Sequence, residues 1–281
     1  MPNLRFLLKV SRPRFWFYIF GPYIVGLIAG AATRNDLLDW RTILFAVYFL
    51  FPGNLLIYGI NDIFDFETDE FNTKKVEYET LVDRSHHRSL AIWIAVFNIP
   101  FIVAVLIFVP AAWISVAGFL FFSLLYSAPP IRAKTIPFLD SAFNVLYVFP
   151  GVFGYQLLSG SFPPIQLLIA AGLWTAAMHA YSAIPDIQAD RNAGLQTIAT
   201  FLGPYVTLVV CAVLYVAAAI IATEYLGFVS LSLGSIYLIL MIASIRSVKT
   251  DRLFKLYRYF PIINVLSGFL IFWQIALDKL L

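Results

Sequence analysis

The sequence predicts an all-α membrane protein with nine transmembrane helices, and three observations support this prediction. Of the 281 residues, 61% are hydrophobic and 12% are charged, which is about half the charged share of an ordinary soluble domain. Apolar runs long enough to cross the hydrocarbon core of a bilayer recur along the whole chain. Lysine and arginine gather in alternate connections between these runs, as in polytopic membrane proteins.

Each predicted helix is an apolar run of about 20 residues, the length that spans about 30 Å of hydrocarbon. We see no secretory cleavage signal, so the first run is expected to be a retained helix. Tight turns at VPAAW and TEYLGF separate the third run from the fourth and the seventh from the eighth. The nine runs lie near 14–33, 41–61, 90–109, 111–127, 138–158, 165–184, 203–222, 227–245 and 260–277.

We expect one polytopic membrane domain over residues 1–281, without a separate soluble domain. Two halves, about 14–127 and 138–245, echo each other weakly, and the ninth helix at 260–277 follows them. The sequence therefore indicates a parallel repeat of about four helices.

The distribution of basic residues predicts the orientation of the chain. Sixteen of the nineteen lysines and arginines fall in the N-terminal tail and in the loops after helices two, four, six and eight. The other side receives Arg34, Arg41 and Lys279. Because cytoplasmic segments are enriched in Lys and Arg, we place the N-terminus and these loops in the cytoplasm, at the plasma (inner) membrane, and the C-terminus outside. A wrong number of helices would place these basic residues on both sides of the membrane, so their uneven distribution also supports the prediction of nine helices.

Charge and cysteine content exclude several classes of protein. The net charge of +3 is too small to suggest binding to nucleic acid. Cys211, the single cysteine, lies in an apolar run, so the chain has no intrachain disulfide and no cysteine-based zinc site.

The stretch NDIFDFETDEFN places a dense block of carboxylates at the end of the second apolar run. Asn61, Asp65 and Asp69 are spaced i, i+4, i+8, and Asp62 lies on the same side of a helix. All four fall within an arc of roughly 100°. Since like charges at this spacing repel, a positive group should compensate them.

A second acidic pair follows the sixth run in the stretch YSAIPDIQADRNAG. Asp186 and Asp190 are i, i+4 partners, and four spans separate them from the first cluster. Both clusters therefore emerge on the same side of the membrane.

Two acidic clusters on one side suit a hard divalent cation such as Mg²⁺, which takes oxygen ligands and shares its shell with substrate phosphates. Nearby basic side chains could take up the remaining charge of a diphosphate leaving group. The alternative is that each cluster is a solvated loop face, and we assign His86 and His87 to the surface in the same way. The basic candidates in the appropriate loops are Lys74, Lys75, Arg132, Lys134 and Arg191.

With these residues the chain resembles the UbiA superfamily of intramembrane prenyltransferases. Its first motif, N-D-x-x-D-x-x-x-D, is matched by Asn61, Asp62, Asp65 and Asp69, and its second, D-x-x-x-D, by Asp186 and Asp190. The resemblance covers nearly the whole chain. It implies nine helices around a central cavity that is capped by cytoplasmic loops and open sideways to lipid. It also implies Mg²⁺, with two ions expected, and an isoprenyl diphosphate donor.

A narrower resemblance is to the lycopene elongase branch, which attaches C5 units to carotenoid ends. The stretches NDIFDFETDEFNTKK and AIPDIQADRNAGLQTIATFLG carry it, although Thr73 stands where that branch often has proline. The Arg-Pro-Leu run common in the wider family is absent. This branch implies dimethylallyl diphosphate as the favoured donor and a hydrophobic acceptor that enters from the bilayer.

The resulting hypothesis is a Mg²⁺-dependent prenyltransferase. All six motif residues would bind metal, and Asp65, Asp69, Asp186 and Asp190 would carry catalysis. Metal and basic residues draw off diphosphate, a nucleophilic carbon of the acceptor attacks the allylic cation, and proton loss or water capture ends the reaction. Asp140 and Asn144 are the candidates for receiving that proton.

Three alternatives remain open at this point. The acceptor could be an aromatic quinone precursor or another lipid, within the same superfamily. The chain could be a transporter, because intramembrane acids often mark ion pathways, although both clusters lie at one surface and in parallel orientation. A lipid phosphotransferase would carry a D-G-x-x-A-R stretch, which the sequence lacks.

Overall fold

The computed structural model describes residues 3–66, 82–250 and 252–280, and within these ranges every regular element is a helix. The chain divides into two compact units, Met1–Arg132 with Phe149–Phe162, and Ala133–Val148 with Pro163–Leu281. The α-helices of the first unit are α1 (Leu4–Val10), α2 (Phe17–Gly30), α3 (Trp40–Leu50), α4 (Pro52–Phe64), α7 (Arg84–Phe108), α8 (Trp113–Ser127) and α10 (Phe149–Ser159). Those of the second are α9 (Leu139–Ala142), α11 (Ile165–Ala183), α12 (Ile187–Asn192), α13 (Ile198–Ser247) and α14 (Arg252–Leu280).

The helices follow the predicted apolar runs closely. Six helical segments are long and apolar enough to cross a membrane, counted over the described residues. The predicted spans 203–222 and 227–245 both fall within α13, where Gly203 (φ 73°) and Gly227 (φ 52°) interrupt the helical backbone. The predicted turn TEYLGF is therefore confirmed, as is VPAAW, where a 3₁₀ turn covers Pro110–Ala112. These boundaries are consistent with nine spans.

Two predicted helices are not continuous. The run 41–61 consists of α3 and α4, separated at Phe51, because Pro52 has no N–H to continue the helical ladder. The run 138–158 consists of α9, a 3₁₀ segment at Phe143–Tyr147, and α10.

Asparagine side chains satisfy the backbone at the break between α3 and α4. Asn54 is buried, and its amide donates to the carbonyl oxygens of Phe49 and Leu50 at 2.9 Å each. Asn98 on α7 donates to the carbonyl oxygen of Pro52 at 3.2 Å. An unsatisfied backbone group costs several kcal/mol within the hydrocarbon region, so these bonds make a mid-span break tolerable.

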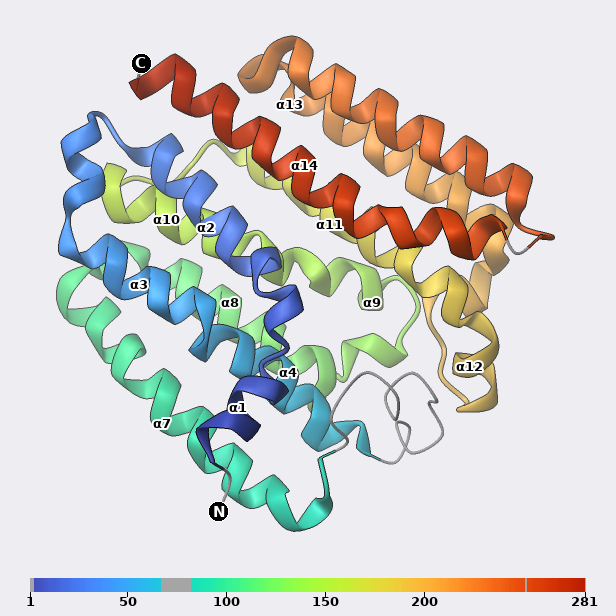
Figure 1. Ribbon diagram of the computed structural model, residues 1–281, viewed down its shortest axis with the longest axis horizontal. Helices are drawn as coiled ribbons and strands as arrows, with labels where there is room; N and C mark the ends of the chain where they lie inside the picture. The colour runs from blue at the N-terminus through green and yellow to red at the C-terminus, as the bar shows by residue number, and fades with distance from the viewer. Residues whose placement is uncertain (1–2, 67–81, 251, 281) are drawn as a thin grey trace. The chain divides into compact units, whose positions relative to one another are not determined.

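Small residues allow α2 and α10 to pack in backbone contact, and the two helices run side by side in Figure 1. A Cβ atom at Gly26 would lie 2.0 Å from the carbonyl oxygen of Gly151. At Gly154 it would lie 2.4 Å from the carbonyl oxygen of Tyr23. Only glycine fits at such positions, which is the usual way for membrane helices to approach closely.

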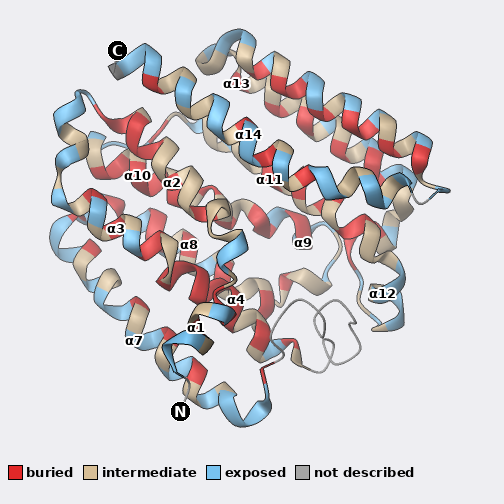
Figure 2. Ribbon diagram, in the orientation of Figure 1, coloured by how far each residue is buried: buried red, intermediate tan, exposed pale blue. Residues whose placement is uncertain are grey.

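One face of α7 is apolar and exposed. Figure 2 shows much of this helix as exposed, while α4 is mostly buried. The exposed side chains recur at helical spacing, whereas Leu90, Ile94 and Val105 are buried on the other side. A continuous apolar exposed face is expected where a helix meets lipid. The exposed residues are Ile92, Val96, Ile99, Val103 and Leu106.

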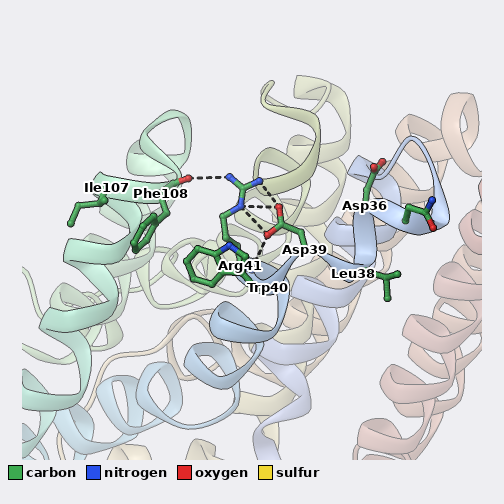
Figure 3. Close-up of a pocket in the computed structure, with 8 residues that line it drawn as sticks. Asp36, Leu38, Asp39, Trp40, Arg41, Ile107 and Phe108 are labelled. Atoms are coloured by element: carbon green, nitrogen blue, oxygen red, sulfur yellow. Dashed lines mark hydrogen bonds and ion pairs between the residues drawn. The ribbon is translucent and has the colours of Figure 1, made fainter.

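A hollow of about 820 Å³ lies at the Trp40 end of α3, and its lining includes no residue of the acidic motifs. Figure 3 shows Arg41 there, bonded to Asp39 and to the carbonyl oxygen of Phe108. The Arg41 side chain lowers the pKa of Asp39. These contacts fasten the start of α3 to the end of α7, so we regard the hollow as part of a structural junction.

Candidate active site

Helix α4 carries the first acidic motif to its C-terminal end. Asp62 and Asp65 are 5% and 3% exposed, which is unusual for carboxylates. The helix ends at Phe64, and Asp65 is its C-cap with φ −106° and ψ 1°. The expected helical spacing holds from Asn61 to Asp65, whose N–H donates to the backbone carbonyl oxygen of Asn61 at 2.9 Å. Asp69, Lys74 and Lys75 lie outside the described residues.

Arg12 supplies the positive charge that the repelling carboxylates require. Its Nη2 donates to Oδ1 of Asp62 at 2.6 Å, and the guanidinium carbon lies 4.8 Å from the ring centroid of Tyr58. The Arg12 side chain is 13% exposed, so both members of the ion pair are largely withdrawn from water. A buried pair of this kind is costly to break because it leaves a buried charge without compensation.

Arg132, predicted to bind diphosphate, approaches the same motif. Its Nη2 lies 3.8 Å from Oδ1 of Asp65 and donates to the carbonyl oxygen of Phe64 at 3.2 Å. Arg12 and Arg132 both have left-handed backbones, with φ 50° and 48°. Such conformations are costly for residues other than glycine and often accompany functional sites.

Asn61 is held by α8. Its Nδ2 donates to Oγ of Ser127 at 3.1 Å, and Ser127 is 1% exposed. This contact joins the Asn61 side chain to the end of α8. In the first unit, the structure thus brings together Asn61, Asp62, Asp65 and Arg132, and adds Arg12.

The second motif follows α11 in the second unit. The helix tightens into a 3₁₀ turn at Ile184–Asp186 and continues as α12. Asp186 and Asp190 are half-buried, as the predicted i, i+4 pair. Thr197 Oγ1 lies 3.5 Å from Oδ2 of Asp190, and Arg191 Nη2 donates to the carbonyl oxygen of Thr200 at 3.3 Å. Lys134 lies in a 3₁₀ turn at Ala133–Thr135.

Asp140 and Asn144, the candidates for receiving a proton, have structural roles. Asp140 is fully buried, and its two oxygens accept backbone N–H groups of Ser141 and Ile198, each at 2.8 Å. Ile198 is the first residue of α13, so Asp140 caps this helix from 58 positions away. Asn144 donates to the carbonyl oxygen of Asp140 at 2.7 Å. Both side chains therefore bond to the backbone, and their part in receiving a proton stays a prediction.

The side-chain oxygens of the motif residues are suitable ligands for Mg²⁺. Carboxylate and amide oxygens are hard ligands, and carboxylates this deeply buried at the end of an apolar helix need a positive partner. No group of three or more His, Cys, Asp or Glu side chains that could hold a metal by itself occurs among the described residues.

Sequence reasoning missed Arg12 and Ser127. Arg12 was counted only toward the charge bias of the N-terminal tail, although SRPRF lies at the start of the first apolar run and on the predicted side of both motifs. Of the chain's three histidines, His179 is the one that lies inside a predicted membrane span.

Comparison with known proteins adds a family assignment. The model of the UbiA prenyltransferase family matches residues 19–276. A lycopene elongase/hydratase of Haloarcula japonica is 39% identical over 276 residues, covering 98% of this chain and 92% of that protein. One from Haloferax volcanii is 40% identical, covering 96% and 88%.

A solved structure supports the fold. The UbiA homolog from Archaeoglobus fulgidus, bound to DMAPP and Mg²⁺, matches with a TM-score of 0.68 at 20% sequence identity, covering 96% of this chain and 99% of that one. At this identity the match establishes a shared fold.

Proposed function

Because the chain belongs to the UbiA prenyltransferase family and is therefore an integral-membrane prenyltransferase, we propose that it transfers a C5 unit from dimethylallyl diphosphate to lycopene or a related carotenoid. The observation that carries this proposal is full-length similarity to lycopene elongase/hydratases at 39–40% identity, with both acidic motifs present.

Both motifs would serve to bind diphosphate through Mg²⁺. We assign Asn61, Asp62, Asp65 and Asp69 of the first motif, with Asp186 and Asp190 of the second, to Mg²⁺ binding, with two ions expected. Bound Mg²⁺ would neutralise the diphosphate and make it a better leaving group. The buried carboxylates Asp62 and Asp65, each beside an arginine, support this assignment.

Basic residues would bind those diphosphate oxygens that Mg²⁺ does not coordinate. Arg132 is suited to this role because it contacts Asp65 while its side chain remains 39% exposed. A guanidinium can donate two parallel hydrogen bonds to a phosphate, which fixes the departing group. Lys74, Lys75, Lys134 and Arg191 remain candidates for the same role.

The polyene acceptor is chemically permissible. An alkene has no phenol to deprotonate, so no base is needed before its π electrons attack the allylic cation. Such an acceptor could enter from lipid and needs only a dry, apolar environment, where aromatic rings can stabilise positive charge. Helix segments rich in Phe and Tyr around Asp140 and Phe149 would suit this lining.

A quinone precursor is the second candidate acceptor, because the same superfamily motifs serve aromatic prenylation. It would need a polar anchor for its carboxylate or phenol. The test is expression in a lycopene-producing host, followed by pigment mass spectrometry. New C45 and C50 pigments support the proposal. An unchanged pigment profile, together with prenylation of 4-hydroxybenzoate or a naphthoate by purified protein, would reject it in favour of the quinone branch.

The orientation is also proposed. We infer that the N-terminus and the acidic motifs lie on the cytoplasmic side of the plasma membrane, with the C-terminus outside. The charge bias of the loops supports this placement.

A further inference from the structure

His179 is a histidine within the apolar helix α11, and its Nε2 lies 3.7 Å from Oδ2 of Asp140. Asp140 is fully buried, whereas the His179 side chain is 18% exposed. Histidine exchanges protons near neutral pH more readily than any other side chain. A polar ring at this position in a membrane helix therefore requires a reason.

The Asp140 carboxylate cannot turn away from this histidine. Backbone N–H groups of Ser141 and Ile198 hold one oxygen each, at 2.8 Å. The His179 ring therefore faces a carboxylate whose position is fixed by the backbone, at 3.7 Å from Nε2. Asp140 thus contacts His179 in addition to capping α13.

The position of His179 along α11 suits the hydrocarbon part of a substrate. It precedes Asp186 by four α-helical steps and three steps of the 3₁₀ turn, so the two residues lie about 12 Å apart along the axis and within about 40° of the same side. A prenyl diphosphate held at Asp186 by its phosphate end would extend its carbon chain in this direction. The histidine would then lie near the reacting carbons rather than the phosphate oxygens.

We propose that His179 receives the proton that ends the reaction, with Asp140 as its positioning residue. The proposal rests on the proposed carotenoid function. In the reaction, the C–O bond of the donor breaks and its electron pair leaves with diphosphate. The terminal π electrons of the acceptor form the new C–C bond, which creates a tertiary carbocation on the neighbouring carbon.

The carbocation can then be quenched in two ways, and in each of them the imidazole receives one proton. In the first, a C–H bond adjacent to the cation breaks, its electrons form a new double bond, and His179 takes the proton. In the second, a water oxygen adds to the cation, and His179 takes a proton from the added water, which leaves an alcohol. The histidine therefore influences which product forms as well as how fast.

A purely structural role makes a different prediction. If His179 served only as a counter-ion for buried Asp140, its replacement would lower stability and leave the ratio of alkene to alcohol unchanged. If the departing diphosphate took the proton, neither rate nor ratio would depend on His179.

The test compares His179→Gln and His179→Ala with the control His86→Gln, which changes an exposed histidine on α7. Purified proteins receive Mg²⁺, dimethylallyl diphosphate and lycopene, and folding is checked by thermal unfolding. We expect elongated pigment to form about 100-fold more slowly in both His179 variants, with a changed ratio of alkene to alcohol, because the two endings release the proton from different atoms. Added imidazole should restore part of the rate in His179→Ala.

Normal rate and product ratio in folded His179→Gln would overturn the proposal. So would a slower rate with an unchanged ratio and no rescue by imidazole, which would assign His179 to the counter-ion role. Absence of elongated pigment from the unmodified protein would instead reject the proposed carotenoid function, so the two failures can be distinguished.

Discussion

Arg12 and Asp62, fifty residues apart in sequence, form a 2.6 Å ion pair that joins the segment before α2 to the end of α4. The pair places a fixed positive charge on one of the carboxylates assigned to metal. It offsets the repulsion between Asp62 and Asp65 before any cation or diphosphate is present. The same guanidinium lies over the ring of Tyr58, one turn earlier on α4.

Removing this charge should destabilise the protein most when metal is absent. Loss of one partner of a buried ion pair costs about 3–5 kcal/mol, so Arg12→Ala should lower the melting temperature in detergent and EDTA by at least about 5 °C. Added Mg²⁺ should raise it by more than in the unmodified protein, because the cation would replace the missing charge.

Arg14→Ala is the matched control, since it removes an equal charge from an exposed neighbour. Arg12→Lys should behave closer to the unmodified protein because it keeps the charge. Equal melting temperatures for Arg12→Ala and Arg14→Ala, with and without Mg²⁺, would show that the pair contributes nothing.

Activity should depend on both acidic motifs and on a divalent cation. Asp65→Ala and Asp186→Ala should each reduce diphosphate release by more than about 100-fold, because each removes an oxygen ligand from the metal. EDTA should abolish activity, and Mg²⁺ or Mn²⁺ should restore it. Asp278→Ala, at an exposed position near the end of α14, should retain activity. Full activity of either motif variant, or of the protein in excess EDTA, would contradict the assignment.

The sequence predicted the helices well because lipid imposes a simple rule on it. A membrane span must be apolar over about 20 residues, so its location is visible in composition alone. The turn at Gly227 was also visible, since glycine reaches positive φ without strain. The break before Pro52 was missed because the hydrophobic run continues through it. Asn54 and Asn98 make that break possible, and their partners cannot be read from local sequence.

Long-range pairs limited the prediction of the site. The motif residues were visible because they are close in sequence. Arg12 contacts Asp62 across fifty residues, and Asp140 caps Ile198 across 58. Such pairs depend on how helices pack, and one sequence carries little information about that. The capping role of Asp140 was missed for this reason, since its partner Ile198 lies far along the chain.

Labelling with a membrane-impermeant thiol reagent should test the predicted topology. Cys211 is buried and can be replaced by alanine to give a cysteine-free background. Single cysteines would then replace the exposed residues Arg88, Lys249, Arg34 and Lys279. In intact cells, positions 34 and 279 should react, whereas 88 and 249 should react only after the membrane is opened. Reaction at 279 and 249 from the same side would refute the nine-span count.

The backbone contact between α2 and α10 should make Gly154 intolerant of any side chain. A Cβ atom there would lie 2.4 Å from the carbonyl oxygen of Tyr23 and 2.9 Å from the amide nitrogen of Leu27. Both are backbone atoms, so the helices themselves would have to separate. Gly154→Ala should therefore destabilise the protein by about 1–3 kcal/mol or more, measured as a lower melting temperature in detergent.

Gly21→Ala is the appropriate control because it lies on α2, the packing partner of α10, with nothing within 4 Å of the added methyl group. Alanine restricts the unfolded chain and favours helix, so this change should be neutral or stabilising by up to about 1 kcal/mol. The two substitutions add the same methyl group to helical glycines and differ in the space around it. If both lowered the melting temperature equally, the loss would not come from the contact between α2 and α10. A specific loss at Gly154 would instead establish that close approach of α2 and α10 stabilises the first unit.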